Sequence, residues 1–191
     1  SYTSSNLEFD TDILRYGYTS MTTPNSVYDY NMSTKEQELK KQSEVIDDTF
    51  KPENYSSERI YVTARDGVKV PVSIVYKKGT KLDGSAPLLL YGYGSYGASM
   101  DPYFSSVRLS LLNRGFVYAI AHIRGGQELG RQWYEDGKLL KKMNTFNDFI
   151  DCGKALIDKK YTSQGHLYAQ GGSAGGLLMG ASINIEPELW N

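Results

Sequence analysis

Cysteine and histidine are both scarce in this sequence. The 191 residues include one cysteine, Cys152, and two histidines. A single cysteine cannot form a disulfide within the chain, which is usual for proteins of a reducing compartment, and we predict a cytoplasmic location. No run of apolar residues is long enough to cross a membrane, so no membrane partner is expected.

An excess of charge of either sign is also lacking. Lysine and arginine number 21 against 22 aspartates and glutamates, which gives a net charge of −1. A domain that binds nucleic acid carries a clustered excess of basic residues. The one basic cluster here, Lys138, Lys141 and Lys142, stands beside Glu135 and Asp136 and is predicted to be a solvated surface. We therefore predict no nucleic-acid partner.

The first 50 residues are rich in features of β-structure. The whole sequence has 16 tyrosines, many of them in extended-looking stretches, and tyrosine favours strands. We predict strands over 13–18, 27–31 and 37–41, separated by short turn-like segments. Antiparallel units of this kind occur in β-sandwiches and in propeller blades, and one unit does not distinguish the two.

A linker and a hairpin are predicted next. Residues 52–57 contain proline, asparagine and serine and are typical of a linker. Two alternating stretches, 59–64 and 68–76, flank Asp66 and Gly67. An Asp-Gly pair between two such stretches predicts a β-hairpin.

From residue 87 onward, strands alternate with helices. We predict strands at 87–91, 116–123 and 167–170, and helices at 104–112, 146–157 and 177–183. The helix at 146–157 has one apolar face, and Thr145 with Asp148 is predicted to cap its start. The alternation predicts an α/β fold, with a mainly parallel sheet and helices on both faces.

Residues 171–175, Gly-Gly-Ser-Ala-Gly, match the pattern G-x-S-x-G. A nucleophilic serine stands on a sharp, strained turn between a strand and a helix, and small neighbours let that turn pack closely. A chance match in a chain of this length has a probability of roughly 0.1, but an apolar strand before the motif and a helix after it provide the required setting. We predict Ser173 as the nucleophile, with the amide of Ala174 donating to the oxyanion. The alternative is a glycine-rich turn that only packs tightly.

A serine nucleophile also needs a histidine base and a carboxylate. In α/β-hydrolases these residues follow the serine in the sequence. Both histidines, His122 and His166, precede Ser173, and we interpret both as structural. The catalytic acid and base are therefore expected beyond Asn191. Since the sequence also starts without methionine, we expect it to be an internal piece of a longer polypeptide, whose remainder completes the catalytic domain.

A second glycine motif spans residues 92–97, Gly-Tyr-Gly-Ser-Tyr-Gly, and matches G-x-G-x-x-G. That pattern can bind a dinucleotide, but only where a helix opens directly after it. Here Pro102 interrupts the following segment, two tyrosines fill the loop, and the next strand ends without a carboxylate. We predict no cofactor and no metal ion. The loop is better interpreted as presenting a tyrosine hydroxyl beside the nucleophile.

Several longer strings resemble the prolyl oligopeptidase family of serine peptidases, and within it the oligopeptidase B branch. They are YGYGSYGAS at 91–99, RGFVYAIAHIRGG at 114–126, GRQWYEDGKLLKKMNTFNDF at 130–149 and GGSAGGLLMG at 171–180. The resemblance implies that residues 1–50 end a β-propeller, as strands of its last blade. Residues 51–191 would then be the first part of an α/β-hydrolase catalytic domain that ends after the nucleophile helix.

The resemblance also implies roles for individual residues. Tyr93 is the second oxyanion donor through its hydroxyl, and Tyr96 lines the substrate cleft, whereas Arg124 and Trp133 are interpreted as structural. The implied activity is serine endopeptidase cleavage of short peptides after Arg or Lys. The 191 residues alone are expected to be inactive. An esterase or lipase of the same fold and a non-catalytic scaffold remain alternatives. The loop at residues 92–97, called the tyrosine loop below, stands in place of an HGGG-type loop and favours the peptidase.

Overall fold

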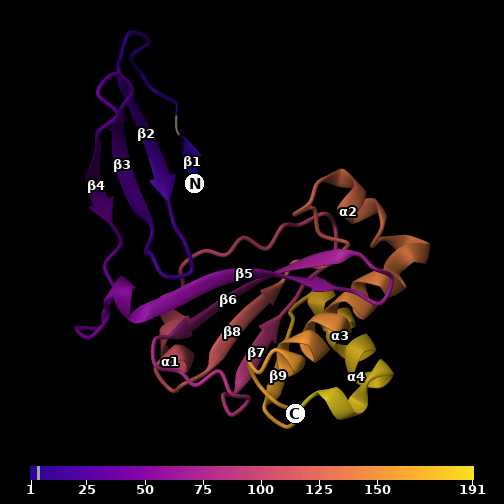
Figure 1. The fold of residues 1–191 in the computed structure, drawn as a ribbon. Helices are drawn as coiled ribbons and strands as arrows, with labels where there is room; N and C mark the ends of the chain where they lie inside the picture. Colours follow the sequence, from indigo (N-terminus) through magenta and orange to yellow (C-terminus); the bar gives the residue numbers. More distant parts are fainter. Residues whose placement is uncertain (4) are drawn as a thin grey trace.

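Two separate β-sheets divide the chain (Figure 1). The computed structural model describes residues 1–3 and 5–191. The first sheet has four strands in the order β1-β2-β3-β4, and the second has five in the order β5-β6-β8-β7-β9. The helices lie around the second sheet.

The first sheet is antiparallel throughout. Its strands are β1 (Tyr2–Thr3), β2 (Ile13–Tyr18), β3 (Ser26–Asn31) and β4 (Gln37–Gln42). The rings of Tyr16 and Tyr28 stack across β2 and β3 with their centroids 5.4 Å apart. Arg15 and Asp29 pair across the same two strands at 2.6 Å. The three predicted strands are confirmed, and only the two-residue β1 was missed.

The second sheet is mixed. Its strands are β5 (Tyr55–Thr63), β6 (Lys69–Lys77), β7 (Leu88–Tyr91), β8 (Val117–Ala121) and β9 (Leu167–Gln170). Strands β8, β7 and β9 are parallel neighbours, as predicted. The hairpin β5–β6 joins β8 in the antiparallel sense, so the parallel part is confined to these three strands.

The predicted linker at 52–57 is wrong in its second half. Residues Pro52–Asn54 form one turn of 3-10 helix, and β5 begins directly afterwards at Tyr55. The Tyr55 side chain explains the early start, because its ring is buried and its hydroxyl donates to Asn113 Oδ1 at 2.8 Å. Apolar burial of a tyrosine together with a satisfied hydroxyl stabilises the extended conformation there.

Helices cover both faces of the second sheet. They are α1 (Ser106–Leu112), α2 (Arg131–Glu135), α3 (Lys142–Asp158) and α4 (Ala174–Ile185), with short 3-10 turns at Leu139–Lys141 and Pro187–Leu189. Alternate residues of a strand point to opposite faces. Leu88 and Leu90 of β7 pack with Phe149 of α3, whereas Leu89 packs on the other face with the cluster that contains Leu109 of α1.

The predicted cap of α3 is wrong. The helix begins at Lys142, one turn before the predicted start, so Thr145 lies inside it. The Thr145 hydroxyl donates to the carbonyls of Arg124, at 2.7 Å, and Gly137, at 3.0 Å. Asp148 accepts hydrogen bonds from Arg124 instead of capping the helix. Both side chains are fully buried and serve tertiary contacts, which a capping pattern in the sequence does not reveal.

Phe149 is the central side chain between α3 and the sheet. It is fully buried and stacks on Trp190 with a centroid distance of 5.3 Å. Truncating Phe149 to alanine in the protein that contains this chain should lower the free energy of unfolding by about 3–5 kcal/mol, because a cavity is left in a packed core. The fully exposed Leu140 is the control, and Leu140→Ala should change stability by less than about 0.5 kcal/mol. Equal losses in urea-induced unfolding would contradict this description of the core.

Candidate active site

Ser173 occupies a strained backbone position between a strand and a helix. It follows β9 by three residues and immediately precedes α4. Its backbone angles are φ 55° and ψ −121°, a region that costs a non-glycine residue about 1–3 kcal/mol. The residue is exposed, and its side chain makes no capping hydrogen bond with the helix. The hydroxyl is therefore not used to cap the helix and stays available, as a nucleophile requires.

Close backbone contacts explain the glycines around Ser173. A Cβ atom on Gly171 would lie 2.5 Å from the carbonyl oxygen of Gly175. One on Gly175 would lie 3.0 Å from the carbonyl oxygen of Gly92. The turn therefore presses against the end of β7 through backbone atoms alone. A side chain at position 171 would clash with the Gly175 carbonyl, and one at position 175 would displace the Gly92 carbonyl by a few tenths of an ångström, so both positions favour glycine.

The amide of Ala174 meets the requirements of an oxyanion donor. Ala174 is the first residue of α4, and the first amides of a helix have no acceptor within it. Gly175 and Gly176 donate to the carbonyls of Gly172 and Ser173, at 2.8 Å each, but the described part of the chain gives the Ala174 amide no backbone acceptor. The positive end of the helix dipole adds to the attraction for a negative oxygen.

The tyrosine loop lies against this turn. Gly92 continues the ladder between β7 and β9, since its amide donates to the Gln170 carbonyl at 3.1 Å. The next residue is Tyr93, and a Cβ atom on Gly175 would lie 3.7 Å from Cδ2 of its ring. The structure thus brings Tyr93, predicted from the sequence as the second donor, to the first turn of the nucleophile helix.

Tyr96 projects from the same loop. Its backbone has φ 59°, and its side chain is 80% exposed. It borders a cavity of about 430 Å³ that Ala174 and Leu177 of α4 also line, together with Tyr134. The structure thus places Tyr96 on the same cavity as the first residue of α4, and its contact with substrate stays a prediction.

Neither histidine faces Ser173. His122 is buried, with Nε2 2.8 Å from Ser73 Oγ and Nδ1 3.7 Å from a carboxylate oxygen of Glu128. His166 precedes β9, and so lies at the opposite end of that strand from Ser173, where its Nδ1 is 3.1 Å from Ser163 Oγ. The structure gives both histidines local polar partners, as expected for structural residues.

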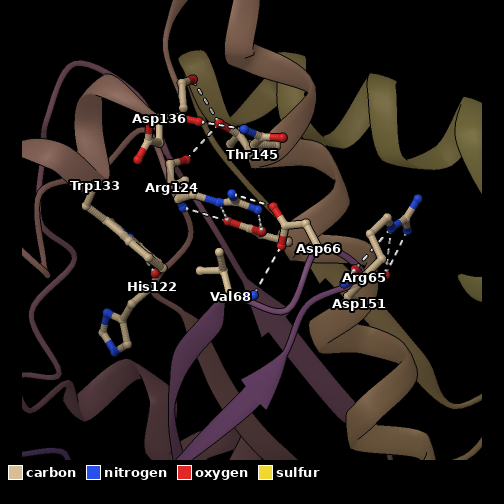
Figure 2. A network of polar contacts seen from close by, with 12 residues as sticks. Arg65, Asp66, Val68, His122, Arg124, Trp133, Asp136, Thr145 and Asp151 are labelled. Atoms are coloured by element: carbon tan, nitrogen blue, oxygen red, sulfur yellow. Dashed lines mark hydrogen bonds and ion pairs between the residues drawn. The ribbon is translucent and has the colours of Figure 1, made fainter.

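Arg124 holds three segments together (Figure 2). It follows β8, and its guanidinium pairs with Asp66 of the hairpin turn at 2.7 Å and with Asp148 of α3 at 2.5 Å. These contacts raise the pKa of Arg124 above its usual value, and the hydrogen bonds to Asp148 have the largest effect. Burial raises the pKa of Asp148, and the hydrogen bonds from Arg124 oppose that rise. Trp133 adds a hydrogen bond from Nε1 to the His122 carbonyl at 3.0 Å.

The basic cluster at 138–142 is only partly a solvated surface. Lys138 and Lys141 pair with Glu135 and Asp136, as a surface interpretation predicts. Lys142 is half-buried and donates to the tyrosine loop instead. Neither composition nor spacing distinguishes Lys142 from its neighbours, and the sequence interpretation was wrong for this residue.

Two further observations concern ions and membranes. Within residues 1–3 and 5–191, no three histidine, cysteine, aspartate or glutamate side chains gather as they do around a metal ion. No helix in that part of the chain has the length and apolar character needed to span a bilayer.

Sequence comparisons match both parts of the chain to known families. Residues 102–191 match the model of the prolyl oligopeptidase family, and residues 1–43 match the model of its N-terminal β-propeller domain. Among curated relatives, dipeptidyl aminopeptidase BI of Pseudoxanthomonas mexicana is 55% identical over 97% of this chain and 25% of its own length. Protease 2 of Moraxella lacunata is 46% identical over 95% of this chain and 26% of its own length.

Comparison with solved structures points to the same family. Oligopeptidase B from Leishmania major superposes with a TM-score of 0.86 at 46% identity, covering 96% of this chain and 26% of its own. A structure from a study of two prolyl endopeptidases gives a TM-score of 0.88 at 41% identity, covering 98% of this chain and 27% of its own. The chain thus spans about a quarter of the length of these relatives. The serine turn, the mixed sheet and these matches together show that the chain belongs to the prolyl oligopeptidase family of serine peptidases.

Proposed function

We propose that the protein containing this chain is a serine oligopeptidase that hydrolyses short peptides through an acyl-enzyme on Ser173. The observation that carries the proposal is the strained conformation of Ser173 between β9 and α4, with its hydroxyl unused by the fold. Backbone strain of this size persists where the surroundings impose it, and it is concentrated at functional sites. The family membership then favours peptides as the substrates.

The proposed reaction has two halves. Ser173 Oγ attacks the carbonyl carbon of the scissile bond, and its proton passes to a base. The carbonyl oxygen becomes an oxyanion, which accepts hydrogen bonds from the Ala174 amide and the Tyr93 hydroxyl. Collapse expels the amine, which takes up the proton, and water then hydrolyses the ester to the acid and regenerates the serine.

The base in this scheme comes from outside the described residues. His122 and His166 both have local partners and do not face the serine. Without a base, a serine hydroxyl is a weak nucleophile near neutral pH. We therefore propose that residues 1–191 alone have no readily detected peptidase activity, and that the longer polypeptide supplies the acid and base.

The proposed domain division follows the two sheets. Residues 1–50, which hold the four-stranded sheet, would end a β-propeller, and residues 51–191 would begin the catalytic domain. The match of residues 1–43 to the propeller domain supports this division.

Cleavage after Arg or Lys is proposed for the substrate. Its support is the likeness to the protein named protease 2 and to the structure named oligopeptidase B. A second candidate, release of dipeptides from a free N-terminus, is favoured by the 55% identity to the protein named dipeptidyl aminopeptidase BI. The two candidates share the chemistry at Ser173 and differ in which end of the peptide must be recognised.

Removing the Ser173 hydroxyl should abolish activity. In the full-length protein, Ser173→Ala should lower kcat by at least about 1,000-fold on peptide amides, because the acyl-enzyme can no longer form. Ser99→Ala, which alters an exposed serine near the tyrosine loop, is the matched control and should keep full activity. A panel of arginyl, lysyl and prolyl amides, each with a blocked and a free dipeptide N-terminus, then separates the candidate specificities. Undiminished turnover by Ser173→Ala would refute the proposed function.

The Tyr93 hydroxyl should act on the transition state. Tyr93→Phe should lower kcat by about 10–1,000-fold, the scale for losing one oxyanion donor, while KM changes far less. Tyr103→Phe removes a hydroxyl from a half-exposed tyrosine on the segment before α1 and should leave kcat unaltered. Steady-state kinetics on one peptide amide decide the matter. An unaltered kcat in Tyr93→Phe would remove Tyr93 from the oxyanion site.

A further inference from the structure

Lys142 connects α3 to the loop that carries Tyr93. It is the first residue of α3, and its side chain reaches across to the residues that follow Tyr93. Its Nζ donates to the Gly94 carbonyl at 2.5 Å and to Ser95 Oγ at 2.9 Å. The carbonyl of Gly94 is only one residue beyond Tyr93, so this contact acts on the backbone next to the proposed oxyanion donor.

The charge of Lys142 has no carboxylate to balance it in the described part of the chain. The neighbouring lysines, Lys138 and Lys141, each pair with an acidic side chain. Lys142 is half-buried, and this burial lowers the pKa of its ammonium group. Placing a cation there without a counter-ion costs free energy unless its N–H groups are satisfied by good acceptors. The loop supplies those acceptors, the Gly94 carbonyl and Ser95 Oγ. A lysine on an open surface would be hydrated instead.

Backbone atoms also pack closely against the Gly94 carbonyl. A Cβ atom on Gly125 would lie 2.0 Å from the Gly94 oxygen, so the two segments touch. The Gly97 amide donates to the Gly125 carbonyl at 3.0 Å, which fastens the far end of the loop. Gly94 itself has φ 66°, a conformation that favours glycine. The Gly94 carbonyl oxygen thus contacts both the Lys142 ammonium and the Gly125 backbone.

We propose that Lys142 is a positioning residue, which fixes the loop at Gly94 and Ser95 so that the Tyr93 hydroxyl stays directed at the oxyanion. This role rests on the proposed function and deepens it. Pre-organised donors are effective because they need not reorient during the reaction, and a displacement of about 1 Å can cost about 100-fold in rate. Lys142 also lines the cavity that Tyr96 and Ala174 border. A direct contact with the substrate there would show as a change in KM, whereas the positioning role acts through Tyr93 on kcat.

The test is a double-mutant cycle in the full-length protein. Lys142→Met keeps an unbranched side chain only one atom shorter and removes the N–H groups, and it should lower kcat by about 10–100-fold with KM nearly unchanged. In the Tyr93→Phe background the same change should have little further effect, because the hydroxyl that Lys142 positions is already gone. Lys141→Met is the matched control. Lys141 is exposed, adjoins Lys142 and pairs with Asp136, and its replacement should leave kcat unaltered.

The outcomes separate the possible failures. Losses from Lys142→Met and Tyr93→Phe that multiply would overturn the positioning role, since they would show that Lys142 acts independently of the tyrosine. An unaltered kcat in Tyr93→Phe would also overturn the positioning role, because no catalytic hydroxyl would be left for Lys142 to position, whereas undiminished turnover by Ser173→Ala would count against the proposed function itself. Thermal unfolding of each variant identifies any that fail to fold. If Lys142→Met does not fold, Ser95→Ala removes one of the two acceptors and should lower kcat in the same non-additive way. An unaltered kcat there would overturn the proposal.

Discussion

The close approach of two backbone segments, the end of β7 and the turn after β9, is the constraint on which the site depends. The parallel register pairs Tyr91 with Gln170, so the residues that follow, Gly92 and Gly171, leave the sheet side by side. A Cβ on Gly171 would lie 3.0 Å from the Gly92 carbonyl oxygen and 2.5 Å from that of Gly175, and the shorter contact leaves no room for a side chain. With this contact in place, Ser173 and Tyr93 project from neighbouring positions at the carboxyl edge of the sheet, where open α/β sheets bind their ligands.

The strain at Ser173 has to be compensated by the packing around it. An unfavourable backbone conformation persists only where the surroundings determine it. Here the apolar helix α4 places Leu178 in the core beside Phe149, and Phe149 in turn packs under Gly92, where a Cβ would lie 2.7 Å from its ring. The buried core and the turn that carries Ser173 are therefore parts of one arrangement. The network around Arg124 supports the same arrangement from behind, since it joins the hairpin, β8 and α3.

The sequence predicted the elements that have strong local signals. The alternating apolar pattern of the strands, the Asp-Gly turn and the G-x-S-x-G motif each identified their segment, and β2 and β9 have the predicted bounds. The failures have a common cause. Thr145 and Asp148 satisfy a capping pattern, but both side chains hydrogen-bond Arg124, more than 20 residues earlier, and Thr145 also bonds the Gly137 carbonyl outside the helix. Lys142 likewise stands in a charged stretch typical of a surface, and only the folded structure reveals its acceptor in the tyrosine loop.

The most direct measurement of the central claim is a structure of the full-length protein with a peptide aldehyde bound covalently. The aldehyde carbon should be bonded to Ser173 Oγ, and its oxygen should lie about 2.7–3.1 Å from both the Ala174 amide nitrogen and the Tyr93 hydroxyl. The loop should keep its contact between Gly94 and Lys142 in that complex. An adduct on a different residue, or an oxygen that meets neither donor, would contradict the account.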